Sequence, residues 1–336
     1  FNVRNGEIYM IKLKTFGSFT VGNDITSVQE GAWRSEKLEK LFVYLAMNRN
    51  RGVCIEDISE AIWQVEEETD NPVGALKNLA YRLRKALRDA SFGEECIVSV
   101  RGGLYKWNDD VEVTIDVEEF DRYINEAEMA FCRSKDTAIE SYEKAIALYH
   151  GDFLPLRTDT HWFMTLNAFY HSRYVNTVKA LAKLYIDTGC YEKLEQLCTK
   201  AIVYERSDEQ IYSYLIVARM RTKKVQMAFD TYEAAKAIMD NDLGVRKTVM
   251  LNKVYEELLS VTKGVSSYNI DEVKDDISEE SMNGVFMCGY PVFKEIYHLE
   301  VRKSARSTVP ESLVLVTVVP MYSSQPDKDH SQMKDS

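Results

Sequence analysis

The sequence predicts a mainly α-helical protein that begins with an α+β region, continues with an all-α region of repeated helices and ends with a short α/β segment. Three observations favour this fold class. Short strand-like and helical segments alternate over about the first 110 residues. Helical periodicity then runs from 116 to about 259, and strand-like segments return after an acidic, serine-containing stretch. The length of 336 residues is enough for two or three domains.

The composition is that of an ordinary globular protein, with 45% hydrophobic and 28% charged residues and a formal net charge of −11. The longest apolar stretch, residues 313–319, has the length of a strand, so we expect no membrane span. Six cysteines without a CxxC pair favour reduced side chains in a cytoplasmic protein. Because the chain begins with Phe1 rather than Met, we expect its natural N-terminus to be missing.

The sequence contains no pattern of catalytic or metal-ligating residues. The five histidines form no HxxxH or HExxH spacing, and no Walker loop, GxGxxG or GxSxG motif occurs. The sequence therefore predicts neither an enzyme nor a bound cofactor or metal.

The first region begins with two predicted strands and two predicted helices. Residues 8–21 are rich in β-branched and aromatic side chains and are interrupted by Gly17, a pattern typical of two strands and a turn. A loop over 22–31 precedes a helix over 35–47, for which Ser35 is the expected N-cap, and a shorter helix follows over 56–63. The side chains expected to face inward are Leu38, Leu41, Phe42, Leu45, Ile58, Ala61 and Ile62.

The next segment, residues 71–88, carries five cations and no acid in an otherwise acidic chain. Its apolar residues recur at spacings of three and four, which is one face of an α-helix. That face is predicted to hold Val73, Leu76, Ala80, Leu83 and Leu87. The opposite side is predicted to hold Asn78, Arg82 and Lys85, with Tyr81 and Arg88 beside them. A cationic helix indicates an anionic partner such as nucleic acid. On this segment alone, a solvated basic face is the more common explanation.

Two short strands over 96–100 and 104–107 are predicted to form a hairpin at Gly102 and Gly103, because glycine adopts the positive φ that a tight turn needs. The order is then strands, helix, short helix, basic helix and hairpin. This is the order of a winged helix-turn-helix, in which the last helix enters the major groove of DNA and the hairpin touches a neighbouring groove or the backbone.

The runs VCIEDISEAIW, NPVGALKNLAYRLRKAL and SVRGGLYKW resemble the OmpR/PhoB-type winged helix in the form found in the SARP family (Streptomyces antibiotic regulatory proteins, the AfsR type). The resemblance covers residues 8–117. It implies DNA contacts from the basic helix, the hairpin tip and the start of the first helix. The implied residues are Asn78, Tyr81, Arg82, Lys85, Arg88, Arg101, Arg34 and Ser35. Asn and Arg pair with base edges, whereas Lys and Tyr more often contact phosphate.

The same resemblance implies a contact with RNA polymerase from the loop before the basic helix. Gln64, Glu66, Glu67 and Asp70 fall in that loop, and its acids are equally typical of a plain solvated loop. Lys77 and Arg84 are expected nearer the buried face, where a structural role is at least as plausible as DNA contact.

A repeat of 34 residues is visible in the helical region. Its first copy contains Leu181, Tyr191, Leu194, Cys198 and Ala201, which recur as Leu215, Val225, Ala228, Tyr232 and Ala235. This is the tetratricopeptide period, which predicts a curved solenoid of paired helices with a concave surface. Aromatic side chains could line that surface, but most of them are expected in the core between helices: Tyr170, Tyr174, Tyr212, Tyr214 and Trp162. The turn at Gly151-Asp152-Phe153-Leu154 and the closing run at 254–258 resemble the bacterial transcriptional activator domain.

The predicted boundaries are 7–115 for the winged helix-turn-helix, 116–261 for the activator domain, 262–282 for a linker and 283–336 for the last segment. This last segment is expected to form strands over 284–288 and 313–319 around a helix over 290–304. It resembles the opening of a degenerate diguanylate-cyclase (GGDEF-like) fold that lacks the catalytic signature and ends in a disordered tail. We therefore predict no cyclase activity.

The expected function is that of a cytoplasmic transcriptional regulator. The winged helix is expected to bind double-stranded promoter DNA, and the repeats to mediate homodimerisation, effector sensing or contact with RNA polymerase. The resemblance favours activation over repression. The alternative is a protein-interaction scaffold whose winged helix no longer binds DNA, which the acidic residues Glu94, Glu95, Asp109 and Asp110 near the hairpin favour. A third hypothesis, an enzyme regulated by the C-terminal segment, has no identifiable catalytic group.

Overall fold

The computed structural model describes residues 10–23, 26–64, 71–92, 97–99, 103–157, 159–242, 248–264, 296–297 and 299–301. Contacts divide the chain into two compact units, Phe1–Ser267 and Tyr268–Ser336. The described residues of the second unit are helical and fall within the helix expected over 290–304. The strands expected over 284–288 and 313–319 lie outside the described residues, so the GGDEF-like assignment stays a prediction.

A small sheet opens the first unit, with strands in the order β3-β2-β1-β6. β1 (Ile11–Lys14) and β2 (Thr20–Gly22) pair antiparallel, which confirms the strands predicted over 8–21. β3 (Ser27–Gln29) lies in the predicted loop, and β6 (Val113–Ile115) lies at the end of the region predicted as a winged helix-turn-helix. β6 pairs parallel to β1, so this long-range pairing joins the end of the N-terminal part to its beginning.

Three helices and a hairpin follow the first strands. The helices are α1 (Glu36–Met47), α2 (Ile55–Ile62) and α3 (Pro72–Asp89). Ser35 occupies the N-cap of α1 without a side-chain hydrogen bond, whereas the Asn71 side chain caps α3 by accepting from the Gly74 N–H at 2.8 Å. β4 (Ile97–Ser99) and β5 (Tyr105–Trp107) pair antiparallel, as predicted for the hairpin.

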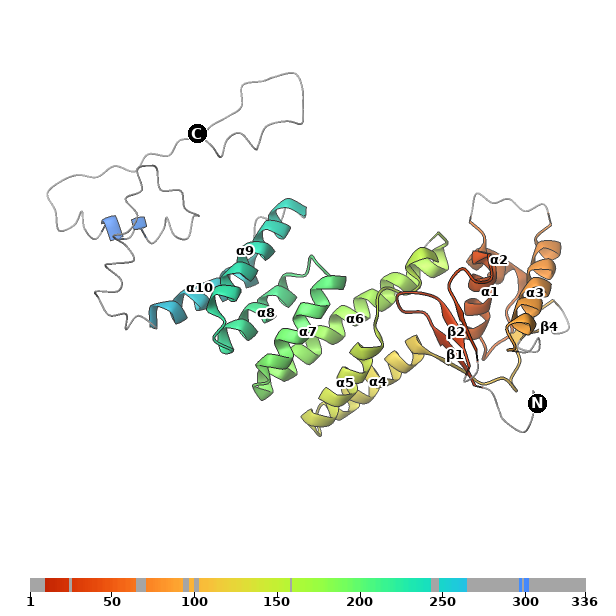
Figure 1. Ribbon diagram of the computed structural model, residues 1–336, viewed down its shortest axis with the longest axis horizontal. Helices are drawn as coiled ribbons and strands as arrows, with labels where there is room; N and C mark the ends of the chain where they lie inside the picture. Colours follow the sequence, from red (N-terminus) through yellow and green to blue (C-terminus); the bar gives the residue numbers. More distant parts are fainter. Residues whose placement is uncertain are drawn as a thin grey trace, which may run out of the picture. The chain divides into compact units, whose positions relative to one another are not determined.

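The remaining elements of the first unit are helical, and consecutive helices pack against one another in a row (Figure 1). They are α4 (Asp116–Ala130), α5 (Lys135–Leu148), the short 3-10 helix η1 (Pro155–Arg157), α6 (His161–Thr188), α7 (Tyr191–Tyr204), α8 (Glu209–Arg221), α9 (Val225–Asp242) and α10 (Val249–Gly264). No helix among the described residues has the length and hydropathy that a membrane crossing needs.

The 34-residue repeat corresponds to repeated helix pairs, because Tyr191 begins α7 and Val225 begins α9. The other repeated positions are buried in both copies, including Ala201 and Ala235, whose small side chains permit close helix packing. Tyr170, Tyr174 and Tyr212 are also buried, whereas Tyr214 and Trp162 are half-buried, which confirms that most of these aromatics belong to the core between helices. The helical part is therefore tetratricopeptide-like.

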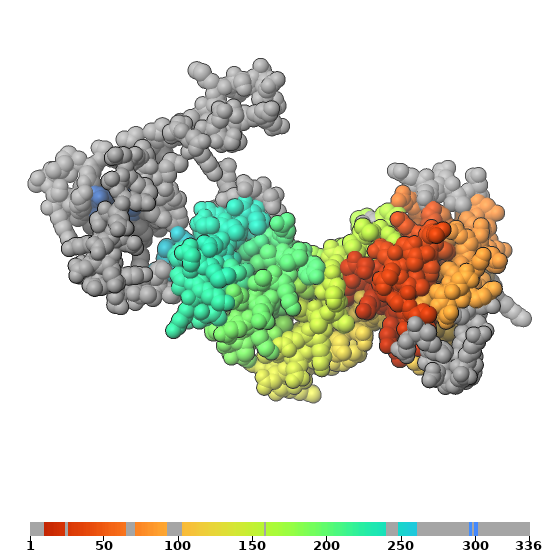
Figure 2. Space-filling model, viewed as in Figure 1, coloured from red at the N-terminus to blue at the C-terminus, as the bar shows by residue number. Residues whose placement is uncertain are grey.

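Helix α1 is buried around its whole circumference, since residues 38–46 are all buried. On one side the Phe42 ring lies 5.4 Å from that of Trp107 in β5. On the other side the Tyr44 ring lies 4.9 Å from that of Trp162 in α6. The red N-terminal part and the yellow-green start of α6 are in direct contact in the space-filling view (Figure 2). The N-terminal part, residues 10–115, and the helical part, residues 116–264, thus share one packed interface.

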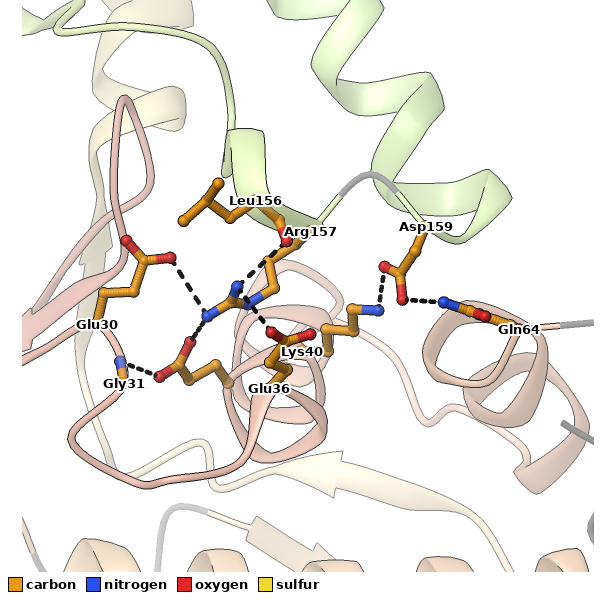
Figure 3. Close-up of polar contacts among 9 residues, drawn as sticks. Glu30, Gly31, Glu36, Lys40, Gln64, Leu156, Arg157 and Asp159 are labelled. Carbon is orange, nitrogen blue, oxygen red and sulfur yellow. Dashed lines mark hydrogen bonds and ion pairs between the residues drawn. The ribbon is translucent and has the colours of Figure 1, made fainter.

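Arg157 carries a buried positive charge into this interface and is 4% exposed. Its Nη2 donates to Glu39 Oε2 at 2.5 Å and lies 3.2 Å from Glu30 Oε1 (Figure 3). Its Nη1 lies 3.6 Å from the exposed Glu36. The second oxygen of Glu39, itself 2% exposed, accepts from the Gly31 N–H at 2.8 Å. Carboxylates from around the start of α1 therefore neutralise a cation supplied by η1.

A second buried cation, Lys40 of α1, points the opposite way across the interface. It is 2% exposed and pairs with Asp159, whose other oxygen accepts from Gln64 Nε2 at 2.9 Å (Figure 3). Nearby, Thr160 Oγ1 donates to the carbonyl of Ala61 in α2 at 2.8 Å. Each part thus supplies both a cation and a carboxylate to the other.

The junction between the two parts is itself held by hydrogen bonds. Asp116, the first residue of α4, is 8% exposed and accepts from the backbone N–H groups of Thr15 and Phe16 at 2.7 and 2.9 Å. It also accepts from the Thr15 hydroxyl at 2.6 Å. Two residues further along α4, Glu118 forms a two-point ion pair with Arg49, at 2.5 and 2.7 Å. The chain passes from β6 into α4 without an intervening loop.

The segment between α5 and η1 also reaches the N-terminal sheet. Phe153 forms an antiparallel bridge with Phe16, and the Gly17 N–H donates to the Asp152 carbonyl at 2.9 Å. Gly17 has a φ of +83°, and a Cβ there would lie 2.6 Å from the His150 carbonyl oxygen. Glycine is therefore required at this close approach.

His171 of α6 holds this segment in place. Its Nδ1 lies 2.7 Å from Asp152 Oδ1 and its Nε2 lies 3.1 Å from Glu205 Oε2. The hydrogen bond to Asp152, followed by the bond to Glu205, outweighs burial and raises the pKa of His171 to about 9. The bond from His171 lowers the pKa of Asp152. The imidazolium thus joins the segment between α5 and η1 to the end of α7.

Replacing Arg157 by Met is expected to lower the free energy of unfolding by about 3 kcal/mol, because Glu39 would stay buried without its cation. Urea denaturation of the full chain measures the change. The matched control is Lys135→Met, which breaks an ion pair whose two side chains are 52% exposed and should cost less than about 1 kcal/mol.

The loss should be partly reversed in the double variant Arg157→Met/Glu39→Gln, because the amide oxygen still accepts from Gly31 but carries no charge. If Arg157→Met and Lys135→Met destabilise equally, the buried cluster contributes no more than a surface pair.

The His171 cluster predicts a dependence of stability on alkaline pH. Because the folded pKa of about 9 lies above the model value of 6.5, the contribution is complete below about pH 6.5 and is lost as the pH rises through about 9. The difference in unfolding free energy between the wild type and His171→Gln should therefore shrink between pH 7 and 10. Urea denaturation across this range, with His161→Gln as control, tests it; a constant difference contradicts the assignment.

Candidate nucleic-acid interface

Helix α3 packs against α1 and α2 through one apolar face. Leu76, Ala80, Leu83 and Leu87 are at most 1% exposed, as predicted for that face. Val73, predicted with them, is 43% exposed, and Leu79 is buried in its place. Val73 lies in the first turn at one edge of the face and Leu79 lies at the other edge, so the core is centred slightly to the Leu79 side.

The opposite face of α3 is exposed to solvent. It brings together five of the predicted DNA-contact residues, Asn78, Tyr81, Arg82, Lys85 and Arg88, all of them exposed. Tyr81 is 63% exposed, an unusual position for a large aromatic ring on a monomer surface. The face therefore combines an amide, a phenol and three cations on one side of a single rigid helix.

Two of the three cations of this face, Arg82 and Lys85, have no counter-charge within the described part of the chain. Lys77, Arg82 and Lys85 have no ion pair or hydrogen bond to any described residue. Asp89 at the last position is the one acid of α3. These three cations are therefore available to an external anion such as phosphate.

The two remaining cations of α3 differ in burial from the predicted pattern. Lys77, expected nearer the buried face, is exposed, because its position on the helix is on the flank rather than within the apolar stripe. Arg84 is half-buried and lies close to Tyr105 in β5. Burial raises the pKa of the Tyr105 phenol, and the charge of Arg84 opposes that increase. This position suits a bracing role for Arg84.

Arg34 and Ser35 lie at the start of α1. Arg34 is exposed, adopts a positive φ of 52° and donates its N–H to the Gly31 carbonyl at 2.9 Å. The Ser35 carbonyl accepts from the Leu38 N–H at 3.1 Å. No hydrogen bond or ion pair among the described residues joins either side chain to the exposed face of α3.

The loop before α3 is described only at its first residue. Gln64 is held at the interface by Asp159, a contact with the helical part that the sequence did not indicate. Glu66, Glu67 and Asp70 lie outside the described residues, as does Arg101 at the hairpin tip. In the hairpin, β5 is anchored to the segment before α2 by paired backbone bonds of 2.8 Å between Val53 and Tyr105.

The sequence also did not reveal the residues that fix the position of α1, the helix on which α3 packs. Lys40 and Arg157 were not among the predicted site residues, and their partners lie 119 and 118 positions away along the chain. The available signal was local: Lys40 directly precedes the apolar run 41–46 of α1, which points to a buried cation that needs a carboxylate.

Residues 115–259 match the family described as the bacterial transcriptional activator domain. A curated relative, the transcriptional regulator RedD of Streptomyces coelicolor, is 23% identical over 238 residues, covering 70% of this chain and 67% of RedD. Among solved structures, Mycobacterium tuberculosis EmbR, in complex with a low-affinity phosphopeptide, superposes with a TM-score of 0.59 at 18% identity, covering 80% of this chain and 71% of that chain.

The likeness to EmbR extends beyond the matched domain and shows a shared fold. The matched range begins at the last residue of β6 and ends within α10, so it covers the helical part described above except for residues 260–264. Residues 115–259 of this protein therefore match the bacterial transcriptional activator domain, within a chain that is similar to a transcriptional regulator over 70% of its length.

Proposed function

We propose that this protein is a cytoplasmic, DNA-binding transcriptional regulator of the SARP type and that it activates transcription. Residues 7–115 act as a winged helix-turn-helix, with α3 as the recognition helix in the major groove. The observation that carries the proposal is the exposed face of α3, where Arg82 and Lys85 have no partner among the described residues. The similarity to RedD, which is named a transcriptional regulator, supports the same conclusion.

Different side chains of α3 have different tasks in this proposal. Asn78 and Arg82 contact base edges, because an amide suits adenine and a guanidinium suits guanine. Tyr81, Lys85 and Arg88 contact phosphate and position the helix. Arg34 and Ser35 add a phosphate contact at the start of α1, where backbone N–H groups favour anions. Arg101 contacts DNA from the hairpin tip.

The net charge of −11 is compatible with DNA binding. The cations of α3 create a local positive field, while the rest of the acidic surface keeps non-specific affinity low. A protein of this kind depends on correct base contacts more than on overall attraction. The acidic residues Asp109 and Asp110 near the hairpin favour the second candidate, a scaffold that does not bind DNA, and the experiment below separates the two.

The predicted activator domain, residues 116–261, serves in this proposal as the interaction domain. Stacked tetratricopeptide-like helices present an extended surface to a peptide, a second copy of the chain or an effector. RNA polymerase is the partner proposed for the loop that contains Gln64, Glu66, Glu67 and Asp70. Asp159 accepts a hydrogen bond from Gln64, the first residue of that loop.

Arg82→Ala is expected to weaken binding to the cognate promoter site by about 1–3 kcal/mol and to relax its sequence preference. Lys85→Ala should instead weaken binding to all duplexes evenly and reduce the slope of log affinity against log salt by about one. Fluorescence anisotropy with duplexes from the protein's own promoter region measures both effects across a salt series.

The matched control is Lys183→Ala on α6, another exposed lysine, which should leave DNA affinity and salt slope unchanged. If the double variant Arg82→Ala/Lys85→Ala binds the promoter as the wild type does, α3 is not the recognition helix. If the wild type binds no duplex with salt-dependent affinity, the scaffold function replaces the proposal.

A further inference from the structure

The helical part contains a cavity of about 620 Å³ between α5, α6 and α7. This volume lies within the range of small-molecule sites. Its inner surface includes Tyr174 and Leu181 of α6, each 1% exposed, and Leu197 of α7. The outer edge is formed by side chains that repeat along one face of α7, among them Lys193 and Lys200.

The two lysines that line the cavity differ in whether a carboxylate pairs with them. Lys193 Nζ donates to Glu143 Oε1 at 2.8 Å, and the Tyr185 hydroxyl donates to the same oxygen at 2.6 Å. Burial acts to raise the pKa of Glu143, but these two bonds outweigh it and lower the pKa. The negative charge of Glu143 is therefore balanced by Lys193. Lys200 lines the cavity two turns further along α7, and no described residue forms an ion pair or hydrogen bond with it.

The end of the cavity nearest Lys200 is aromatic and apolar. The rings of Tyr149 and Tyr174 are stacked with centroids 3.8 Å apart, and Tyr204 meets Tyr149 edge-on at 5.3 Å. Val203 beside them is 72% exposed. A cation without a partner thus lies at the edge of an apolar hollow. We propose that this cavity binds a small organic anion with an apolar body and one carboxylate, sulfonate or phosphate group, which pairs with Lys200.

The cavity wall is also part of the contact with the N-terminal part. The Tyr149 ring that lines the cavity lies 5.0 Å from the ring of Phe16, next to β1. Asp152, three residues further, accepts from the Tyr149 hydroxyl at 2.5 Å and from the Gly17 N–H through its carbonyl. A ligand that displaces Tyr149 would disturb this contact. The bound anion is therefore an effector of DNA binding, a role that rests on the function proposed above.

The experiment uses 8-anilinonaphthalene-1-sulfonate, an apolar aromatic anion, as the probe on the full-length protein. The expected result is saturable fluorescence enhancement that Lys200→Glu weakens about tenfold, because a repulsive charge replaces an attractive one. Ala147→Trp, which adds a ring at an exposed lining position, should abolish it. The matched control, Lys183→Glu on the exposed side of α6, should bind within about twofold of the wild type. Far-UV circular dichroism verifies that each variant is folded.

Absence of saturable enhancement, or equal affinity in Lys200→Glu and Lys183→Glu, overturns the site. A second arm measures affinity for the promoter duplex by anisotropy, with and without saturating probe. The expected change is about fivefold or more in the wild type and none in Ala147→Trp. Equal DNA affinity with and without probe overturns the effector role and leaves the site standing. A wild type that binds the probe but no duplex overturns the proposed function alone.

Discussion

The arrangement of this protein depends on two cations that lie between its N-terminal and helical parts, away from water. Lys40 and Arg157 are 2% and 4% exposed, and a buried charge is tolerated only when a carboxylate meets it in good geometry. The carboxylate for Lys40 comes from the helical part, and those for Arg157 come from the N-terminal part. Neither cation is neutralised unless the two parts are in register. Because α3 packs on α1, this register also fixes the direction in which the exposed cations of α3 point relative to the helical part.

Much of the local structure follows from patterns within short stretches of sequence. Apolar spacing predicted α1, α2 and α3 to within one or two residues at their ends, because each helix has a distinct buried stripe. The exposed face of α3 was predicted in the same way, since residues opposite a buried stripe point to solvent. The 34-residue period was also visible in the sequence, because an equivalent packing environment recurs in each helix pair, and the structure shows that two of its repeated positions begin α7 and α9.

Features that depend on distant partners were not predictable. β3 and β6 have three residues each, too few to show alternation, and β6 exists as a strand through its pairing with β1 at the other end of the N-terminal part. Val73 is exposed and Leu79 is buried, because the neighbouring helices cover the edge of α3 on which Leu79 lies. The cavity beside Tyr149 requires three helices whose relative placement no local pattern contains. Roles for individual side chains of α3 come from chemistry and resemblance.

The enclosure of α1 from both sides limits how this chain can be divided into exchangeable modules. A fragment ending at residue 115 would leave Tyr44 without Trp162 and would bring Lys40 into water without Asp159. The uncovered apolar surface would promote self-association of such a fragment. Transplanting the N-terminal part onto another protein would therefore require new outward-facing residues on α1, whereas α3 and its cationic face would transfer unchanged. Recombination that preserves function is expected to exchange both parts together.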